Sequence, residues 1–391
     1  MDKTSKNLFN NTKLAFTNKS NNELKKAYFL FSILDYSTLT KVGNAFLILV
    51  LKLRLPFKGI IKNTIFNHFC GGETIEDCKK TIDSLKKYKI HAMPEYSIEA
   101  ESSYEGFENY KNDSINLINF LGNLGLPFVA IKCTGLMDIE SLKKISMGEF
   151  DSDSDKFQEF KFRMNELCIA GSKNNVKILI DAEESWIQKA IDIVAIDLMN
   201  KYNRKSAMLF LTHQCYRTGN LSKIKKNLIN AKKNNYTLGV KLVRGAYMEK
   251  ERERAQKYGY QSPIQPSKLD TDNEFNNSLK FCINNIDNIS LWVGSHNESS
   301  CFQLMNLMKV KKISTSDDRI WFSQLYGMSD NISFTLANLG YNVVKLIPFG
   351  PIEKTIPYLI RRANENSSVK GQSNRQFTLI KNEINRRKDL N

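Results

Sequence analysis

The sequence predicts an α/β fold, a (β/α)8 barrel of the TIM type preceded by an N-terminal helical arm. Eight strand-like apolar runs follow one another from His91 onward, with helical patterns between most of them. Strands that alternate with helices indicate a parallel sheet. Several of these strands end in a side chain that can do chemistry, as at the active-site face of such barrels. No GxGxxG motif follows a strand, so a doubly wound dinucleotide-binding sheet is not indicated.

Residues 1–60 are expected to form the helical arm. The segment 21–34, NNELKKAYFLFSIL, places apolar residues at helical spacing, and residues 41–56 continue in that style. Lysines lie near the apolar run Ala45–Leu51, which is too short to span a bilayer. Two interpretations remain, an arm packed on the barrel or an amphipathic helix on a membrane surface. The barrel is expected to occupy residues 61–391.

The barrel is expected to open with a helix from Thr74, a capping residue followed by Glu76 and Asp77. An acidic loop that leads into a helix is expected at Met147–Phe160, and a last helix is expected from Gly371 onward. The expected strands are HAMPEYSIEA, PFVAIKCTG, VKILIDA, AMLFLTHQ, LGVKLVRG, ISLWVGSHN, RIWFSQLYG and YNVVKLIPFG.

The composition suits one large barrel plus an appended segment, because 41% of the 391 residues are hydrophobic. The net charge of +16 fits nucleic acid, an anionic membrane, or an anionic substrate or cofactor. Much of it is lysine along helical stretches, which is typical of a solvated face. A non-catalytic basic protein is the alternative from a different class, but it would leave the polar strand ends without a role.

The seven cysteines form no CxxC pair, which indicates reduced thiols and no zinc site. The amino terminus lacks the pattern of a signal peptide, and Asp2 with the missing arginines argues against a transit peptide. We therefore expect a cytoplasmic protein, or one of the mitochondrial matrix if the source is eukaryotic.

The strand ends supply a cluster with more cations than anions, which favours a carboxylate or phosphate ligand. Arg361 and Arg362 form its sharpest element, since guanidinium groups bind carboxylates bidentately. Asp181 is either a base or the partner of a cation. No Ser-His-Asp order or GxSxG elbow is present, so acyl transfer is not indicated. The candidates are Lys132, Asp181, Gln214, Lys241, Arg244, Tyr247, Ser295, His296, Gln324, Tyr358, Arg361, Arg362 and Glu365.

Four segments carry a family resemblance. They are LIDAEESW, KLVRGAYMEKERERAQKYGYQSPIQPS, WVGSHNESS and GMSDNISFTLANLGYNVVKLIPFGPIEKTIPYLIRRANENSSV. From about residue 60 onward the chain resembles the flavin-dependent proline dehydrogenases, in the branch with this single activity. That family has a distorted (β/α)8 barrel with FAD at its mouth. The resemblance implies hydride transfer from C5 of L-proline to flavin N5, formation of 1-pyrroline-5-carboxylate, and electron transfer to membrane quinone.

The resemblance also implies roles for single residues. Arg361 and Arg362 would clamp the proline carboxylate with Lys132 as a third cation, and Asp181 would orient Lys132. Glu365 would pair with one of the arginines. The walls of the substrate ring would be Tyr358 and Leu242, and Tyr247 would either support the site from behind these residues or act as a gating residue. The implied FAD contacts are Gln214, Lys241, Arg244, Gly245, Ala246, Ser295, His296, Asn297 and Glu365.

The chain departs from the family pattern in two places. Leu346, in KLIPFG, stands where the family usually has a tyrosine over the substrate ring, which leaves hydroxyproline as an alternative substrate. His213 replaces a common tyrosine beside Gln214 and is expected to tune flavin binding. The quinone step implies peripheral contact with an anionic inner membrane through the arm. Nucleic acid and metal are not expected as ligands.

Overall fold

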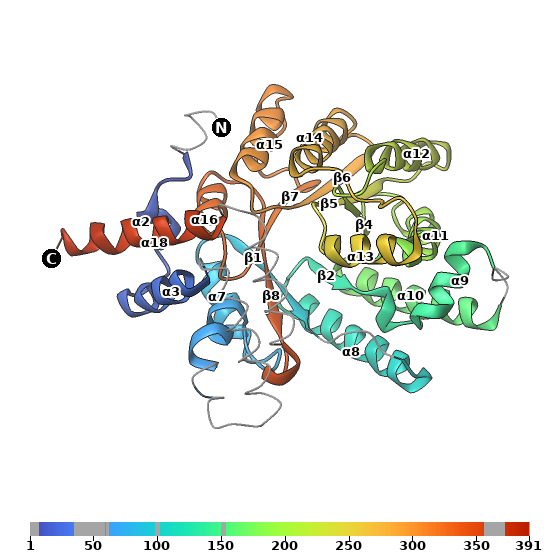
Figure 1. Ribbon diagram of the computed structural model, residues 1–391, viewed down its shortest axis with the longest axis horizontal. Helices are drawn as coiled ribbons and strands as arrows, with labels where there is room; N and C mark the ends of the chain where they lie inside the picture. The colour runs from blue at the N-terminus through green and yellow to red at the C-terminus, as the bar shows by residue number, and fades with distance from the viewer. Residues whose placement is uncertain are drawn as a thin grey trace. The chain divides into compact units, whose positions relative to one another are not determined.

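A computed structural model describes residues 8–34, 59, 62–97, 102–149, 154–355 and 372–390. Its eight strands form one parallel sheet in the order β1-β8-β7-β6-β5-β4-β3-β2, and their helices alternate with them (Figure 1). This order confirms the predicted (β/α)8 barrel. The strands are β1 (Ile90–Tyr96), β2 (Phe128–Ile131), β3 (Lys177–Ile180), β4 (Leu209–Gln214), β5 (Leu238–Val243), β6 (Ile289–Gly294), β7 (Ile320–Leu325) and β8 (Val343–Phe349).

The helical elements that come before β4 in the chain are α2 (Thr12–Ala15), α3 (Asn21–Leu34), the π-helix η1 (Lys62–Phe66), α6 (Asn67–Phe69), α7 (Lys79–Lys86), α8 (Tyr104–Asn123), the 3₁₀ turn η2 (Cys133–Gly135), α9 (Ile139–Met147), α10 (Asp155–Asn174) and α11 (Ser185–Tyr202). Those that follow are α12 (Asn220–Lys233), α13 (Met248–Tyr258), α14 (Lys268–Asn284), α15 (Glu298–Val310), α16 (Asp330–Asn338) and α18 (Gln372–Lys388). The expected helix after the acidic loop therefore begins at Asp155.

The chain divides into two compact units. One contains Met1–Ile98, His296–Cys301 and Ser323–Asn391, and the other contains Glu99–Ser295 and Phe302–Phe322. In the second unit β4 is buried along its whole length, and the ring of Phe128 packs edge-on against Phe210 and Trp321. This apolar interior holds the strand ends of the unit in a fixed register.

The predicted helix start at Thr74 is wrong, because α7 begins at Lys79. The Asp77 carboxylate accepts hydrogen bonds from the backbone N–H groups of Glu73 and Thr74, both at 3.1 Å. The Thr74 hydroxyl in turn accepts the N–H of Asp77 at 3.3 Å. These side-chain bonds stabilise a turn in place of the first helical residues.

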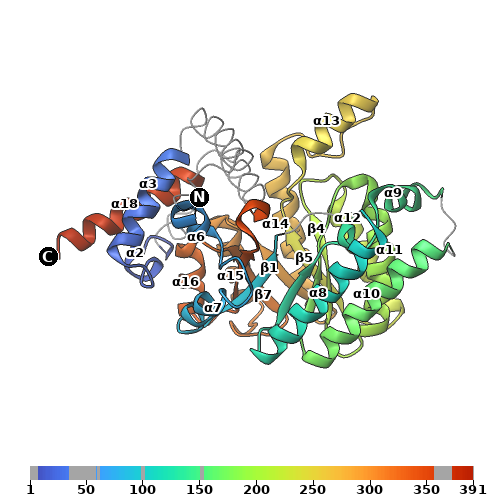
Figure 2. The same ribbon diagram turned by 90° about the horizontal axis from the view of Figure 1, so that it is seen from below.

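The described part of the N-terminal arm packs against the C-terminal helix α18 (Figures 1 and 2). Phe16, Leu24 and Phe31 form a buried apolar cluster with Leu379 and Ile380. The described part of the arm therefore contributes to the folded core of its unit. Among the described helices, none has both the length and the apolar character needed to cross a bilayer. Residues 35–58 lie outside the described part, and the domain boundary at residue 60 stays a prediction.

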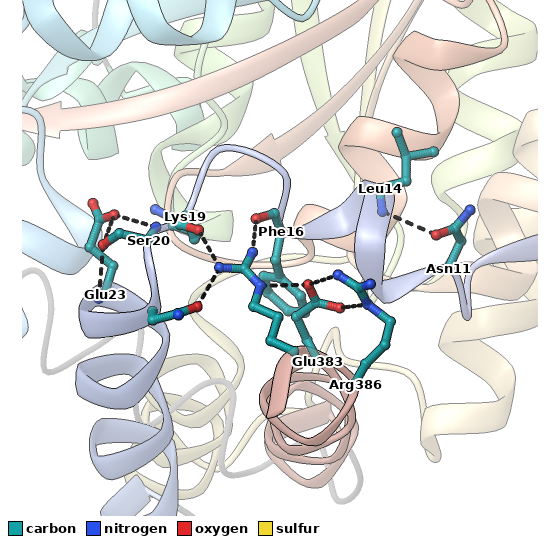
Figure 3. Close-up of polar contacts among 10 residues, drawn as sticks. Asn11, Leu14, Phe16, Lys19, Ser20, Glu23, Glu383 and Arg386 are labelled. Atoms are coloured by element: carbon teal, nitrogen blue, oxygen red, sulfur yellow. Dashed lines mark hydrogen bonds and ion pairs between the residues drawn. The ribbon is translucent and has the colours of Figure 1, made fainter. Parts of the chain in front are cut away.

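A set of polar contacts that we call the terminal clasp joins α18 to the arm (Figure 3). The guanidinium of Arg387 donates to the backbone carbonyls of Phe16 and Lys19, each at 2.9 Å. Glu383 is fully buried and accepts hydrogen bonds from Arg386 and Arg387 at 2.8 Å. Burial raises the pKa of Glu383, but these hydrogen bonds outweigh it and bring the pKa down to about 2. The clasp thus requires an ionised Glu383.

We expect Glu383→Gln to lower the free energy of unfolding at neutral pH by about 2 kcal/mol, the scale of hydrogen bonds to charged groups. Because the folded pKa is depressed, the contribution is present above the unfolded pKa of about 4.3 and is lost as the pH falls toward 2. Urea denaturation of both proteins across this range measures the difference. Asp389→Asn, on an exposed residue, is the control; an equal effect of both substitutions, or a pH-independent difference, would contradict the expectation.

Candidate active site

A buried ion pair lies at the carboxyl ends of β3 and β5. The Nζ atom of Lys241 lies 2.6 Å from Oδ1 of Asp181, and the two side chains are 6% and 17% exposed. Lys241 lies opposite Trp292 in the β5–β6 register, and its ammonium is 5.0 Å from the centre of the indole ring. The carboxylate and the ring face both favour the charged ammonium. The strand ends thus hold a cation in one position.

Asp181 therefore has Lys241 as a partner, whereas Lys132 was its predicted partner. Lys132 follows β2 and precedes the 3₁₀ turn, and its backbone N–H donates to the Tyr110 hydroxyl at 3.1 Å. The orienting effect of Asp181 on Lys132 stays a prediction. Lys132 directly follows β2 and Lys241 lies near the end of β5, so the sequence alone did not distinguish them.

A second network links the ends of β3, β4 and β5. The Gln214 side chain donates to the carbonyl of Glu183 at 2.8 Å and accepts the N–H of Ala246 at 3.4 Å. The Glu183 carboxylate accepts the backbone N–H and the hydroxyl of Thr134 at 3.0 and 2.6 Å. Burial raises the pKa of Glu183 to about 7, although the bonds from Thr134 oppose it. Glu183 was not among the predicted residues, although the paired acids of DAEE follow the same strand as Asp181.

Arg244 is held in place just beyond β5. Its Nε donates to Asp272 at 2.7 Å and its Nη1 donates to Ser295 at 3.1 Å, while its guanidinium lies 4.4 Å from the centre of the Phe275 ring. The next residue, Gly245, has φ +132°, and a Cβ there would lie 1.4 Å from the Tyr216 ring. Only glycine fits this turn. The predicted residues Arg244 and Ser295 are thereby brought into contact.

His296 belongs to the other compact unit. Its Nδ1 lies 2.9 Å from the Ser329 hydroxyl oxygen, and its Nε2 accepts the N–H of Leu325 at 3.5 Å. Asn297 accepts the N–H of Ser300 at 3.1 Å and so caps the start of α15. In the same unit, Leu346 is partly buried in β8, opposite Met93 of β1. Ser329 was not among the predicted residues.

His213 lines a small pocket of about 50 Å³ after β4, beside Gln214 and Arg217. Burial lowers the pKa of His213 to about 3, so the imidazole is neutral at pH 7. Its Nδ1 lies 3.3 Å from the Asn220 carbonyl oxygen, and no hydrogen-bond partner of Nε2 is present among the described residues. The expected influence on flavin binding stays a prediction.

The remaining predicted residues divide into two groups. Leu242 is fully buried in β5, and Tyr247 directly precedes α13. Gln324, in β7, accepts the Ser333 hydroxyl at 2.7 Å. The residues that lie outside the described part of the chain are Tyr358, Arg361, Arg362 and Glu365.

The chain matches a protein-family model and several known proteins over most of its length. A family model described as "Proline dehydrogenase" matches residues 78–375. The chain is 31% identical to the mitochondrial proline dehydrogenase 1 of Dictyostelium discoideum, with 96% of this chain and 74% of the relative covered. It is 29% identical to the hydroxyproline dehydrogenase of Xenopus laevis, with 95% and 88% covered.

The fold is also that of a solved structure, proline utilization A (PutA) from Bdellovibrio bacteriovorus. The two superpose with a TM-score of 0.79 at 21% identity over 96% of this chain. The chain spans 43% of the length of that protein, so the likeness concerns the barrel fold alone.

Proposed function

The chain belongs to the proline dehydrogenase family, and we propose that it catalyses the first step of proline catabolism. In this reaction L-proline is oxidised to 1-pyrroline-5-carboxylate with FAD as cofactor, and the electrons pass to membrane quinone. The observation that carries the proposal is the family match over residues 78–375, which includes the polar strand ends described above. An alternative from another class, a non-catalytic basic membrane-binding protein, leaves the buried Lys241–Asp181 pair without a role.

The donors at the ends of β4, β5 and β6 fit an anionic, polar cofactor such as FAD. Lys241 and Arg244 are cations fixed by Asp181 and Asp272, and the glycine turn after Arg244 presents backbone groups. FAD held by these residues would supply the acceptor for the hydride from C5 of proline. We propose these residues to hold it: Gln214, Lys241, Arg244, Gly245, Ala246, Ser295, His296, Asn297 and Glu365.

The substrate carboxylate is proposed to bind Arg361, Arg362 and Lys132, because guanidinium groups clamp carboxylates bidentately. Such a clamp fixes C5 in the orientation that hydride transfer requires. The proposed walls of the ring are Leu242, Tyr358 and Leu346, and Asp181 and Tyr247 are proposed to orient the site. The substrate amine must lose its proton before the hydride leaves, so the rate is expected to rise with pH.

A second candidate is oxidation of hydroxyproline. Leu346 supports it, because a leucine side chain lacks the hydroxyl and the bulk of the family's usual tyrosine. The similarity to the hydroxyproline dehydrogenase of Xenopus laevis supports it as well.

Anaerobic mixing of the purified protein with L-proline, and separately with trans-4-hydroxy-L-proline, tests both candidates through the flavin absorbance. We expect proline to bleach the flavin at least about tenfold faster than hydroxyproline. This ratio corresponds to a difference of about 1.4 kcal/mol in activation free energy. Leu346→Tyr should increase this ratio. Faster bleaching by hydroxyproline would transfer the assignment to the second candidate, and the absence of bound yellow flavin would contradict both.

Peripheral membrane contact is proposed for helix α3. Its exposed face carries Lys25, Lys26 and Phe29, whose side chain is 63% exposed. Basic residues beside an exposed aromatic ring suit the surface of an anionic membrane. The relatives from Dictyostelium discoideum and Caenorhabditis elegans are described as mitochondrial. We propose a location on the inner membrane, facing the matrix in a eukaryote or the cytoplasm in a bacterium.

The double substitution Lys25→Glu/Lys26→Glu tests this contact. Each basic residue near an anionic membrane contributes about 1 kcal/mol, so binding to phosphatidylserine vesicles should weaken by at least about tenfold. Co-sedimentation measures the binding, and flavin reduction by proline should stay unchanged. Lys232→Glu/Lys233→Glu, on exposed residues of α12, is the matched control. Equal binding of both double variants would rule out α3 as the contact. Deletion of the arm is less informative, because it would expose Leu379 and Ile380.

A further inference from the structure

We propose that Glu251 is a positioning residue for the segment Arg244–Tyr247. Its carboxylate anchors helix α13 to the first residue of α11, and the anchored helix holds the segment that precedes it. The proposal deepens the proposed function and rests on it in one respect, since the FAD contacts proposed at Arg244, Gly245 and Ala246 lie in this segment.

Glu251 differs from the other acidic residues of α13. Glu249 and Glu253 are exposed, as the charged sequence MEKERERAQKY leads one to expect. Glu251 is fully buried. Its Oε1 accepts the backbone N–H of Ser185 at 2.6 Å, and its Oε2 accepts the Ser185 hydroxyl at 2.7 Å. Both carboxylate oxygens are therefore satisfied by one residue of α11, and the burial of the charge is compensated.

The N-terminus of α11 is capped by this contact. Its own N-cap residue, Glu184, makes no capping hydrogen bond through its side chain and forms an ion pair with Lys250. The Glu251 carboxylate supplies the acceptor that a capping side chain normally provides, and its charge is favourable at the positive end of the helix dipole. Residues 250 and 251 of α13 thus bind residues 184 and 185 at the start of α11.

Arg254 extends the anchor by one helical turn. Its guanidinium lies 4.4 Å from the centre of the Trp186 ring and 4.5 Å from that of Tyr258. In Figure 2 the far end of α13 extends away from the neighbouring helices of its unit. The contacts at Lys250, Glu251 and Arg254 therefore hold its first turns to α11.

The segment between β5 and α13 has no regular structure and includes Gly245, whose φ of +132° is accessible only to glycine. Its start is held by Arg244, which binds Asp272. In the middle, the N–H of Ala246 donates to Gln214 at 3.4 Å, a long hydrogen bond. Its other end is fixed through α13. Removal of the Glu251 anchor would leave the helix that follows this end with fewer contacts to α11.

The test compares Glu251→Ala with Glu251→Gln in the full chain, with Glu253→Ala as the control on the same helix. Glutamine keeps the length of the side chain and an acceptor for Ser185, so it should retain the anchor. Glu251→Ala removes both hydrogen bonds to Ser185, and we expect the dissociation constant of FAD to rise about tenfold as the segment loses its anchor. Glutamine and the control should stay within about twofold of the wild type. Flavin fluorescence during titration of the apoprotein measures this constant.

Hydrogen exchange separates this proposal from the proposed function. Amides of residues 245–258 should exchange at least about tenfold faster in Glu251→Ala, while those of β5 keep their protection. This measurement needs no cofactor, so it shows whether Glu251 anchors residues 245–258 even if the wild-type protein binds no FAD. The absence of FAD binding by the wild type would overturn only the proposed function. Ser185→Ala, which removes the hydroxyl contact alone, should give a smaller change in the same residues and serves if Glu251→Ala does not fold.

Two results would overturn the proposal. One is exchange in residues 245–258 of Glu251→Ala that equals that of Glu253→Ala. The other is a loss of thermal stability in Glu251→Ala with an unchanged dissociation constant of FAD, which would give Glu251 a purely structural role.

Discussion

The ion pair between Lys241 and Asp181 is the contact on which the proposed site depends. β3 and β5 are separated by β4 in the sheet, and this pair joins their carboxyl ends across it. Lys241 is buried and Asp181 is mostly buried, so the charge of each is stabilised by the other. Loss of the carboxylate would leave a buried ammonium without its ion-pair partner, which costs about 3–5 kcal/mol in comparable pairs. The positions of the surrounding groups follow from this constraint.

Further hydrogen bonds and one ion pair connect the neighbouring strand ends. Gln214, at the end of β4, bonds to the chain after β3 and to the chain after β5. Asp272 and Ser295 hold Arg244 from the side of β6. Donors and cations held in this way need little rearrangement when a ligand binds, and such preorganisation is the main source of electrostatic catalysis. The barrel therefore presents a rigid set of cationic and polar groups suited to an anionic cofactor.

The sequence was sufficient for the barrel, because each strand is an apolar run of suitable length with a polar residue at its end. It was insufficient where a contact depends on how the strands pair, or where two local structures compete for the same residues. Lys132 and Lys241 are equivalent partners for Asp181 by pattern, and only the sheet places Lys241 beside it. Thr74 has the pattern of a helix cap, yet Asp77 stabilises a turn there. Glu251 belongs to a stretch whose charge predicts exposure, and its burial follows from a contact with Ser185, distant in sequence.

The most direct test of whether the proposed cofactor site depends on the Lys241–Asp181 pair is titration of apoproteins with FAD. The proteins compared are the wild type, Asp181→Asn, Lys241→Met and the double variant. Each single substitution should raise the dissociation constant of FAD by about tenfold or more, because each leaves the cation absent or misplaced. The double variant should bind no more weakly than the weaker single variant, since the two residues act as one unit. Losses that simply add, or an unchanged dissociation constant in Asp181→Asn, would contradict the account.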